Sequence, residues 1–148
     1  MGSVGGAIGP IYASGLLAVA ATVRKLPPAE TLSTEWVLAC AEAAEAAVSG
    51  LGGAAPADKT ILDALHPAVL SLRHSTKAGA AVDDALVEAA AAAREGAAST
   101  AEMTARVGRA SRLGERSRGV ADPGATSFGL ILSALAAAYV REAAGRSS

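Results

Sequence analysis

Alanine dominates the apolar residues of this chain, and this constrains the fold more than any other feature. Apolar residues make up 51% of the 148 positions, whereas aromatic residues make up only 3%. Alanine is the strongest helix former and the smallest side chain that can pack. No stretch alternates apolar and polar residues long enough to predict a strand. The sequence therefore predicts an all-α fold of closely packed helices, in a single domain over residues 1–148.

Glycine, proline and polar clusters divide the sequence into five or six helical segments. The predicted segments cover about 10–25, 34–49, 58–75, 81–96, 99–106 and 125–143. Ser33 or Thr34 is expected to cap the second helix, and the glycines at 50–53 to end it. Asp58 is expected to cap the third helix, which Pro67 is expected to bend.

The charge balance and the single cysteine exclude several classes of protein. Thirteen basic residues against 14 acidic ones give a net charge of −1, without the basic excess of a nucleic-acid-binding protein. Cys40 cannot form an internal disulfide and is interpreted as a small core residue. We therefore expect a cytoplasmic protein with no nucleic-acid partner.

Two apolar stretches raise the question of a membrane or a leader sequence. Residues 1–23 carry no charge and contain AVA at 18–20, which resembles a signal-peptide cleavage site. A signal peptide begins with basic residues, but the first cation here is Arg24. The second stretch, 128–140, is shorter than the roughly 20 residues that a bilayer requires. We expect neither a signal peptide nor a membrane span.

The segment 108–124 is rich in glycine and arginine and has little apolar periodicity. It reads GRASRLGERSRGVADPG, and five arginines fall between Arg106 and Arg118. The planar guanidinium matches phosphate oxygens, and glycine lets the backbone approach a ligand closely. These residues predict a long ordered loop that binds a phosphoanion. The alternative is a solvated basic loop whose arginines pair with nearby acids such as Glu115.

Three motifs occur in an order that resembles the nucleotide-binding (L) subunit of dihydroxyacetone kinase. They are SVGGAIGP at 3–10, PADKTILD at 56–63, and the glycine- and arginine-rich loop with its DPGA ending at 122–125. Together they extend from Ser3 to Ser127, so the resemblance covers nearly the whole chain. It implies an antiparallel barrel of amphipathic helices that holds ADP or ATP at one end, in the loops between helices.

The resemblance also implies a nucleotide site, although it places no catalytic residue in this chain. The implied residues are Ala7, Ile8, Gly52, Ile61, Arg109, Asp122, Pro123 and Gly124. Ala7, Ile8 and Arg109 would lie at the phosphates, and Gly52 and Ile61 would lie nearer the adenine. The remaining three would close over the nucleotide. Backbone N–H groups at a glycine-rich helix start form a natural anion site, which agrees with this arrangement.

The sequence departs from the family pattern in two places. Ile8 stands where the family commonly has serine, which removes a hydroxyl donor and adds a branched side chain. Family members also begin with further helices, where closely spaced aspartates bind two magnesium ions, and this chain starts after that point. The remaining aspartates are not spaced as a compact cluster: Asp58, Asp63, Asp83, Asp84 and Asp122. We expect ADP or ATP as cofactor, no magnesium ligands, and severely reduced phosphoryl transfer.

Other chemically capable side chains are given ordinary roles. His66 and His74 are eight residues apart, which does not suit a metal pair, so they are assigned to the surface or to packing. Trp36 and Tyr139 are assigned to contacts between helices. Ser117 has no partnered base and is not a candidate nucleophile.

Two functions from different classes follow. One is the nucleotide-binding subunit of a phosphotransferase that acts on dihydroxyacetone or a related short keto-sugar. It would need a separate substrate-binding subunit, and its nucleotide is either exchanged as ATP or retained as ADP and rephosphorylated by a phosphocarrier protein. The other is a truncated or degenerate domain that keeps partner contacts or weak nucleotide binding. A third alternative is a natural protein that begins further upstream.

Because absent helices would leave apolar faces uncovered, we also expect homo-oligomers or marginal folding.

Overall fold

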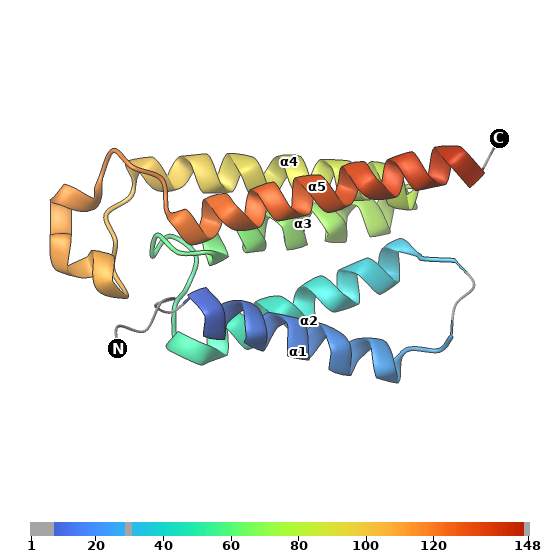
Figure 1. Cartoon of the computed structure of the whole chain (residues 1–148), viewed down its shortest axis with the longest axis horizontal. Coiled ribbons are helices and arrows are strands. Elements are labelled where there is room, and N and C mark those ends of the chain that lie inside the picture. The colour runs from blue at the N-terminus through green and yellow to red at the C-terminus, as the bar shows by residue number, and fades with distance from the viewer. Residues whose placement is uncertain (1–7, 29–30, 147–148) are drawn as a thin grey trace.

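The computed structural model describes residues 8–28 and 31–146, and these fold entirely as helices and connecting segments. The elements are α1 (Ile8–Lys25), α2 (Thr34–Gly52), α3 (Leu62–Ala78), α4 (Val82–Ser99), the 3-10 helices η1 (Thr100–Glu102) and η2 (Arg109–Ser117), and α5 (Pro123–Arg146) (Figure 1). No strand occurs within these two ranges. The predicted all-α class is confirmed.

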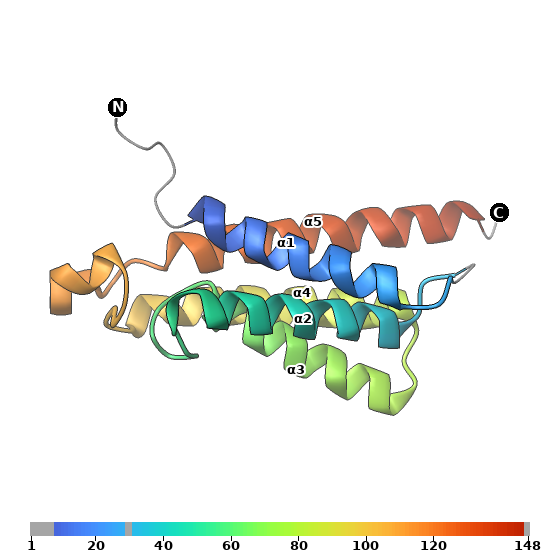
Figure 2. The ribbon, with the colours of Figure 1, turned by 90° about the horizontal axis from the view of Figure 1, so that it is seen from below.

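Consecutive α-helices run in opposite directions and form two packed groups. α1 and α2 form an antiparallel hairpin, while α4 packs against both α3 and α5 (Figure 1). α2 contacts α3 and so joins the two groups. Figure 2 shows that α1 and α5 lie on the same side of the bundle. As a result, the starts of α1, α3 and α5 share one end of the molecule with the ends of α2 and α4.

The contact between α3 and α4 consists mainly of alanine, and we call it the alanine seam. Its buried members are Ala64, Ala68, Ala85, Ala89, Ala93 and Ala97. Gly96 belongs to the same contact, because a Cβ atom built on it would lie 2.0 Å from the Asp63 carbonyl oxygen and 3.0 Å from Pro67 Cγ. Small side chains allow two helix backbones to approach closely. The alanine content therefore determines how tightly this bundle packs.

The ends of α2 are those that the sequence predicts. Ser33 is its N-cap, and the Ser33 hydroxyl oxygen accepts a hydrogen bond of 3.3 Å from the Trp36 N–H. At the other end, Gly53 adopts a left-handed conformation with φ of 64°, and its N–H donates to the Ser49 carbonyl. Both the predicted cap and the glycine stop are confirmed.

The predicted start of α3 is wrong. The helix begins at Leu62, and Asp58 does not cap it. The Asp58 carboxylate instead accepts a hydrogen bond of 2.9 Å from the Ala55 N–H. Residues Ala57 and Lys59 have positive φ values of 74° and 61°, so the chain at this point forms an irregular loop rather than a first helical turn. Pro67 lies inside α3, as expected.

The C-terminal half also differs from the prediction in its details. The short helix expected over 99–106 is limited to η1. The segment expected to be a loop forms η2, which is interrupted at Gly114, where φ is 50° and ψ is −130°. α5 begins at Pro123 and extends three residues beyond the predicted end at 143. An Asp-Pro-Gly sequence is typical of a turn, but here it begins the helix.

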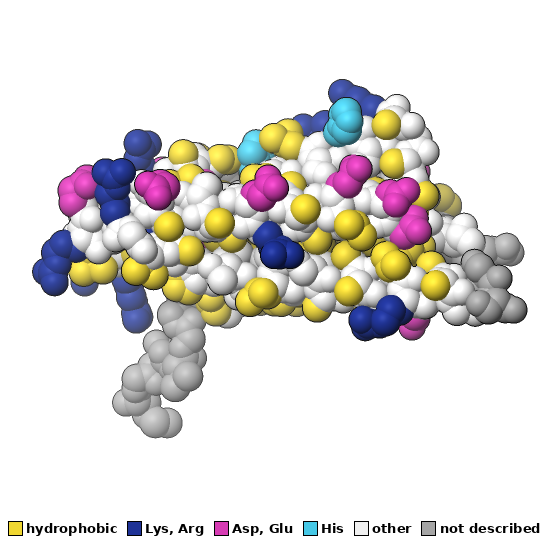
Figure 3. Space-filling model, turned by 90° about the horizontal axis from the view of Figure 1, so that it is seen from above, with side chains coloured by type: hydrophobic (Ala, Val, Ile, Leu, Met, Phe, Trp, Pro, Cys, Tyr) yellow, Lys and Arg dark blue, Asp and Glu magenta, His cyan; other side chains and the backbone are white. Residues whose placement is uncertain are grey.

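Several apolar side chains on α1 and α5 are exposed. Leu16 and Leu17 are 67% and 68% exposed, and Leu130 and Leu135 are 63% and 60% exposed. Figure 3 shows apolar side chains among charged ones on the face that includes α4 and α5. By length and composition alone, α5 could cross a membrane. In this structure it packs lengthwise along α4, so we describe it as a bundle helix.

Candidate functional site

The three motif segments meet the bundle at the same end, where α1, α3 and α5 begin. The second motif, at 56–63, joins α2 to α3, and the third leads into α5 (Figure 1). Most of the first motif, including Ala7, lies outside the described residues, but Ile8 begins α1 at this end. The alternating direction of the helices thus brings together segments that are far apart in the sequence.

Asp122 is the best-anchored of the implied site residues. Its carboxylate accepts a hydrogen bond of 2.8 Å from the Ala125 N–H, and its carbonyl accepts one of 2.9 Å from the Thr126 N–H. Its own N–H donates to the hydroxyl of Thr100, a residue with no exposed surface, over 2.7 Å. Asp122 therefore caps α5 and joins its start to η1.

The carboxyl group of Asp122 is harder to ionise than an ordinary aspartate. Burial raises its pKa above the usual 3.8, while hydrogen bonds from the Ala125 and Gly124 backbones lower it in part. The charge of Asp63 raises the pKa further, and that of Lys59 lowers it. The start of α5 therefore lies in an electrostatic environment that also includes the start of α3.

Asp63 organises the loop between α2 and α3. The side chain is 5% exposed, and its two carboxylate oxygens accept hydrogen bonds from the N–H groups of Ala57 and Thr60, the latter of 2.8 Å. These bonds hold a loop in which two non-glycine residues adopt positive φ. Such conformations are costly and persist only where the surroundings fix them. Asp63 is a major part of those surroundings.

Two contacts join the starts of the helices. A Cβ atom on Gly124 would lie 3.0 Å from the Asp122 carboxylate and 3.6 Å from Ile61 Cβ, an ordinary van der Waals distance, so α5 begins next to the start of α3. Ile61 is only 5% exposed. On the other side, the hydroxyls of Tyr12 and Ser127 form a hydrogen bond of 2.8 Å between α1 and α5.

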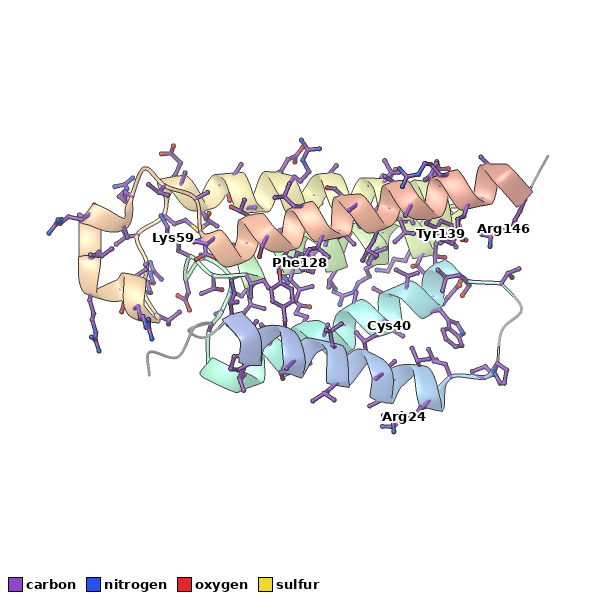
Figure 4. All side chains as sticks on the ribbon, viewed as in Figure 1. Arg24, Cys40, Lys59, Phe128, Tyr139 and Arg146 are labelled. Atoms are coloured by element: carbon purple, nitrogen blue, oxygen red, sulfur yellow. The ribbon has the colours of Figure 1, made fainter. Side chains whose placement is uncertain are left out.

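The segment 101–121, which carries η2 and the arginines, projects beyond the bundle, and we call it the arginine lobe (Figure 1). Lys59 connects this lobe to the bundle. Its ammonium group donates to the Met103 carbonyl over 3.2 Å and to the Ser117 carbonyl. The side chain extends from the α2–α3 loop toward the lobe (Figure 4).

Within the lobe, four of the five arginine side chains make no ion pair among the described residues. The exception is Arg118, which lies 3.5 Å from Glu115. Arg109, the first residue of η2, is exposed. Most of these arginines are thus without an ion-pair partner among the described residues, and their binding of a phosphoanion stays a prediction.

The structure brings some of the implied residues together and leaves others apart. Ile61, Asp122 and Gly124 form one contact group, and Pro123 is the first residue of α5. Ile8 is 40% exposed at the start of α1, and Gly52 is the exposed last residue of α2. They lie at the same end of the bundle, whereas Arg109 lies in the lobe. Their contact with a nucleotide remains a prediction.

The sequence did not reveal the structural roles of Lys59, Thr100 and Ser117. Lys59 was part of a recognised motif but had no assigned role. Ser117 is 7% exposed; its hydroxyl oxygen accepts from the Ala105 N–H and donates to the Gly114 carbonyl. Each of these residues contacts a partner that is distant in sequence or that lies in an irregular segment. Local helical periodicity therefore could not predict these contacts.

No group of three or more histidine, cysteine or acidic side chains that could hold a metal ion occurs in the described ranges. His66 instead contacts the Glu45 carboxylate in a cleft of about 410 Å³ between α2 and α3. Cys40, expected in the core, is only partly buried and lies outside the buried clusters; this burial raises the pKa of its thiol.

Comparison with known proteins gives a consistent result over most of the chain. Residues 1–137 match the DAK2 domain. The chain is 39% identical over 138 residues to the ADP-binding subunit DhaL of the PEP-dependent dihydroxyacetone kinase of Escherichia coli, which covers 93% of this chain and 64% of that protein. It is 34% identical over 132 residues to the corresponding subunit of kinase 1 of Listeria innocua, covering 89% of this chain and 59% of that protein.

A third similar protein comes from another kinase. The L-erythrulose 1-kinase of Mycolicibacterium smegmatis is 48% identical over 91 residues, covering 60% of this chain and 15% of that enzyme. The chain spans less than two thirds of the length of all three proteins.

Proposed function

Because this chain belongs to the DAK2 domain family, we propose that it is the ADP- or ATP-binding part of a kinase that phosphorylates dihydroxyacetone or a related short keto-sugar. Two relatives are named as ADP-binding subunits of dihydroxyacetone kinases, and a third as an erythrulose kinase. The observation that carries the proposal is the meeting of the second and third motifs at one end of the bundle, where Ile61 lies against Gly124.

The chemistry of this end suits a nucleotide. The N-termini of α1, α3 and α5 lie there, and the dipole of a helix favours a phosphate at its N-terminus. Arg109 would add a positive charge for a phosphate, and Ile61 an apolar surface near the base. The chain's own residues thus bind and orient the nucleotide. Magnesium, if bound with the nucleotide, would supply charge neutralisation during transfer.

The remaining parts of the reaction belong to partners in this proposal. A separate subunit would bind the keto-sugar, and a phosphocarrier protein would rephosphorylate the ADP if the nucleotide is retained. Two relatives carry PEP-dependent in their names, which favours the phosphocarrier branch. We place the assembly in the cytoplasm, in keeping with a single unpaired cysteine.

Isothermal titration calorimetry with ADP tests this function. We expect weak binding by the wild-type chain and an affinity lower by about 1.5–3 kcal/mol for Arg109→Ala, because one charge-assisted hydrogen bond to phosphate is lost. Arg141→Ala removes an exposed arginine far along α5 and is the matched control. Equal affinities for wild type and R109A would remove Arg109 from the site. Absence of ADP binding at millimolar concentration would contradict the function itself.

A second candidate is a domain that binds nucleotide or a partner without catalysing transfer. Ile8 favours it, because this side chain offers no hydroxyl to a phosphate at the start of α1. The same titration with and without magnesium tests whether the metal site is lost. Tight magnesium-dependent ADP binding would show that the chain holds the cation and would contradict that loss.

A further inference from the structure

We propose that Lys59 is a positioning residue that fixes the arginine lobe against the bundle and so places Arg109 for phosphate binding. The part that concerns ADP rests on the function proposed above, whereas the part that concerns the lobe does not. Two properties of Lys59 point to a specific role. The residue carries a long cationic side chain but is only 6% exposed, and its backbone has a positive φ of 61°.

The contacts of Lys59 reach two separate points of the lobe. Its ammonium group donates to Met103, just after η1, and to Ser117, the last residue of η2. Both acceptors are backbone carbonyls, so the contact fixes the path of the chain rather than one side chain. A single cation thereby holds both the entry and the exit of the segment that contains Arg109.

Few other contacts hold the lobe to the bundle. The Arg106 N–H donates to the Asp58 carbonyl over 3.2 Å. The large exposed side chains of the lobe, including Leu113 at 51% exposure and Val120 at 70%, contribute little burial. A segment with little buried apolar surface opens locally at low free energy unless specific hydrogen bonds hold it.

The energetic balance of Lys59 favours a role beyond general stability. Burying an ammonium group is costly when no carboxylate lies within ion-pair distance, and the described residues form no salt bridge with Lys59. Lys59 is near enough to Asp122 to lower the pKa of that carboxyl group in part. The ammonium group therefore lies at the end of the bundle where an anionic ligand would bind, with the Asp122 carboxylate as a nearby opposite charge.

The test combines limited tryptic digestion with ADP titration of Lys59→Met, Lys59→Arg and a control, Lys77→Met. The rate of tryptic cleavage measures local opening of the lobe, because the arginines at 106–118 are cleavage sites within it. Met keeps the length of the side chain but leaves two carbonyls without a donor, whereas Arg keeps the charge and the donors. Lys77 is an exposed residue of α3 at the opposite end of the bundle.

For K59M we expect cleavage between residues 106 and 118 to be about tenfold faster, with the helical circular dichroism retained. We expect its ADP dissociation constant to rise about tenfold, and K59R to restore both quantities to within about twofold of wild type. K77M should match wild type in both. Cleavage and affinity of K59M equal to wild type would overturn the proposal.

Two further outcomes are equally decisive. If K59M does not fold, Lys59→Gln replaces it, because the amide retains a donor for one carbonyl; failure of both to fold would assign Lys59 to the bundle and overturn the proposal. The other outcome is that wild type itself does not bind ADP while K59M is still cleaved faster in the lobe. In that case the role of Lys59 in fixing the lobe against the bundle is upheld, and only the proposed nucleotide function fails.

Discussion

At the scale of single residues, glycine and aspartate determine how the site end is built. Gly96 lies where any side chain would meet the backbone of α3, next to the carbonyl of Asp63. The carboxylate of that aspartate holds the α2–α3 loop. Close packing of the seam and the shape of the loop are therefore linked through one residue. Asp122 has the corresponding role at the start of α5.

Gly96→Ala should destabilise the protein strongly. The added Cβ would lie 2.0 Å from a backbone oxygen that cannot rotate away, so α3 and α4 must separate. We expect a loss of about 3 kcal/mol in the free energy of unfolding, at the upper end for overpacking. Gly145→Ala is the control, because its Cβ meets nothing within 4 Å and should be neutral or slightly stabilising. Similar urea midpoints for the two variants would contradict the close contact.

Asp122→Asn should change how stability depends on pH. The folded-state pKa of Asp122 lies above its ordinary value of 3.8, so the folded protein binds this proton more tightly than the unfolded chain. That stabilisation is present below pH 3.8 and is lost as pH rises through the folded pKa. Asparagine caps a helix equally well but does not titrate. Wild type should therefore lose stability relative to D122N as pH rises through this window. Parallel profiles in chemical denaturation would contradict the raised pKa.

At the scale of secondary-structure elements, the sequence predicted what depends on local chemistry. The ends of α2 follow from Ser33 and Gly53, whose effects act within one helical turn. The start of α3 was mispredicted because the Asp58 carboxylate bonds to Ala55, in a loop held by the more distant Asp63. The contact of Ile61 with Gly124 was likewise beyond local patterns, because it depends on how α3 and α5 pack.

Ser33→Ala should weaken the start of α2. It removes the acceptor of the Trp36 N–H, and loss of a serine N-cap costs about 1 kcal/mol. Thr31→Ala, two residues earlier and exposed, is the matched control and should leave the free energy of unfolding within about 0.5 kcal/mol. The measurement is guanidinium unfolding followed by circular dichroism. A shift of equal size in the two variants would argue against the cap.

At the scale of the whole molecule, the most unusual property is the exposure of large apolar side chains on α1 and α5, two helices that lie on the same side of the bundle (Figure 2). Leu16 on α1 and both Ile131 and Leu135 on α5 are 48–67% exposed. α1 carries no charge before Arg24, and α5 carries none before Arg141. Large exposed apolar surface usually marks an interaction site.

The isolated chain should therefore self-associate. We expect sedimentation velocity to show dimers or larger species at about 50 μM, because hydrophobic burial drives association of such surfaces. Replacing Leu16 and Leu135 together by glutamine should shift the distribution toward monomer. Leu113→Gln, an exposed apolar residue of the lobe, is the control and should not. A wild-type monomer at the highest soluble concentration would contradict this prediction.

The alanine seam has an evolutionary consequence. Where two backbones are separated mainly by methyl groups and one glycine, most mutations enlarge a side chain, so the seam should change slowly between related proteins. The exposed side chains at the end of the bundle, such as those of the arginine lobe, face no such restriction. Related proteins can therefore change which ligand this end of the bundle recognises while they keep the same seam. Specificity can then diverge without any change in how the helices pack.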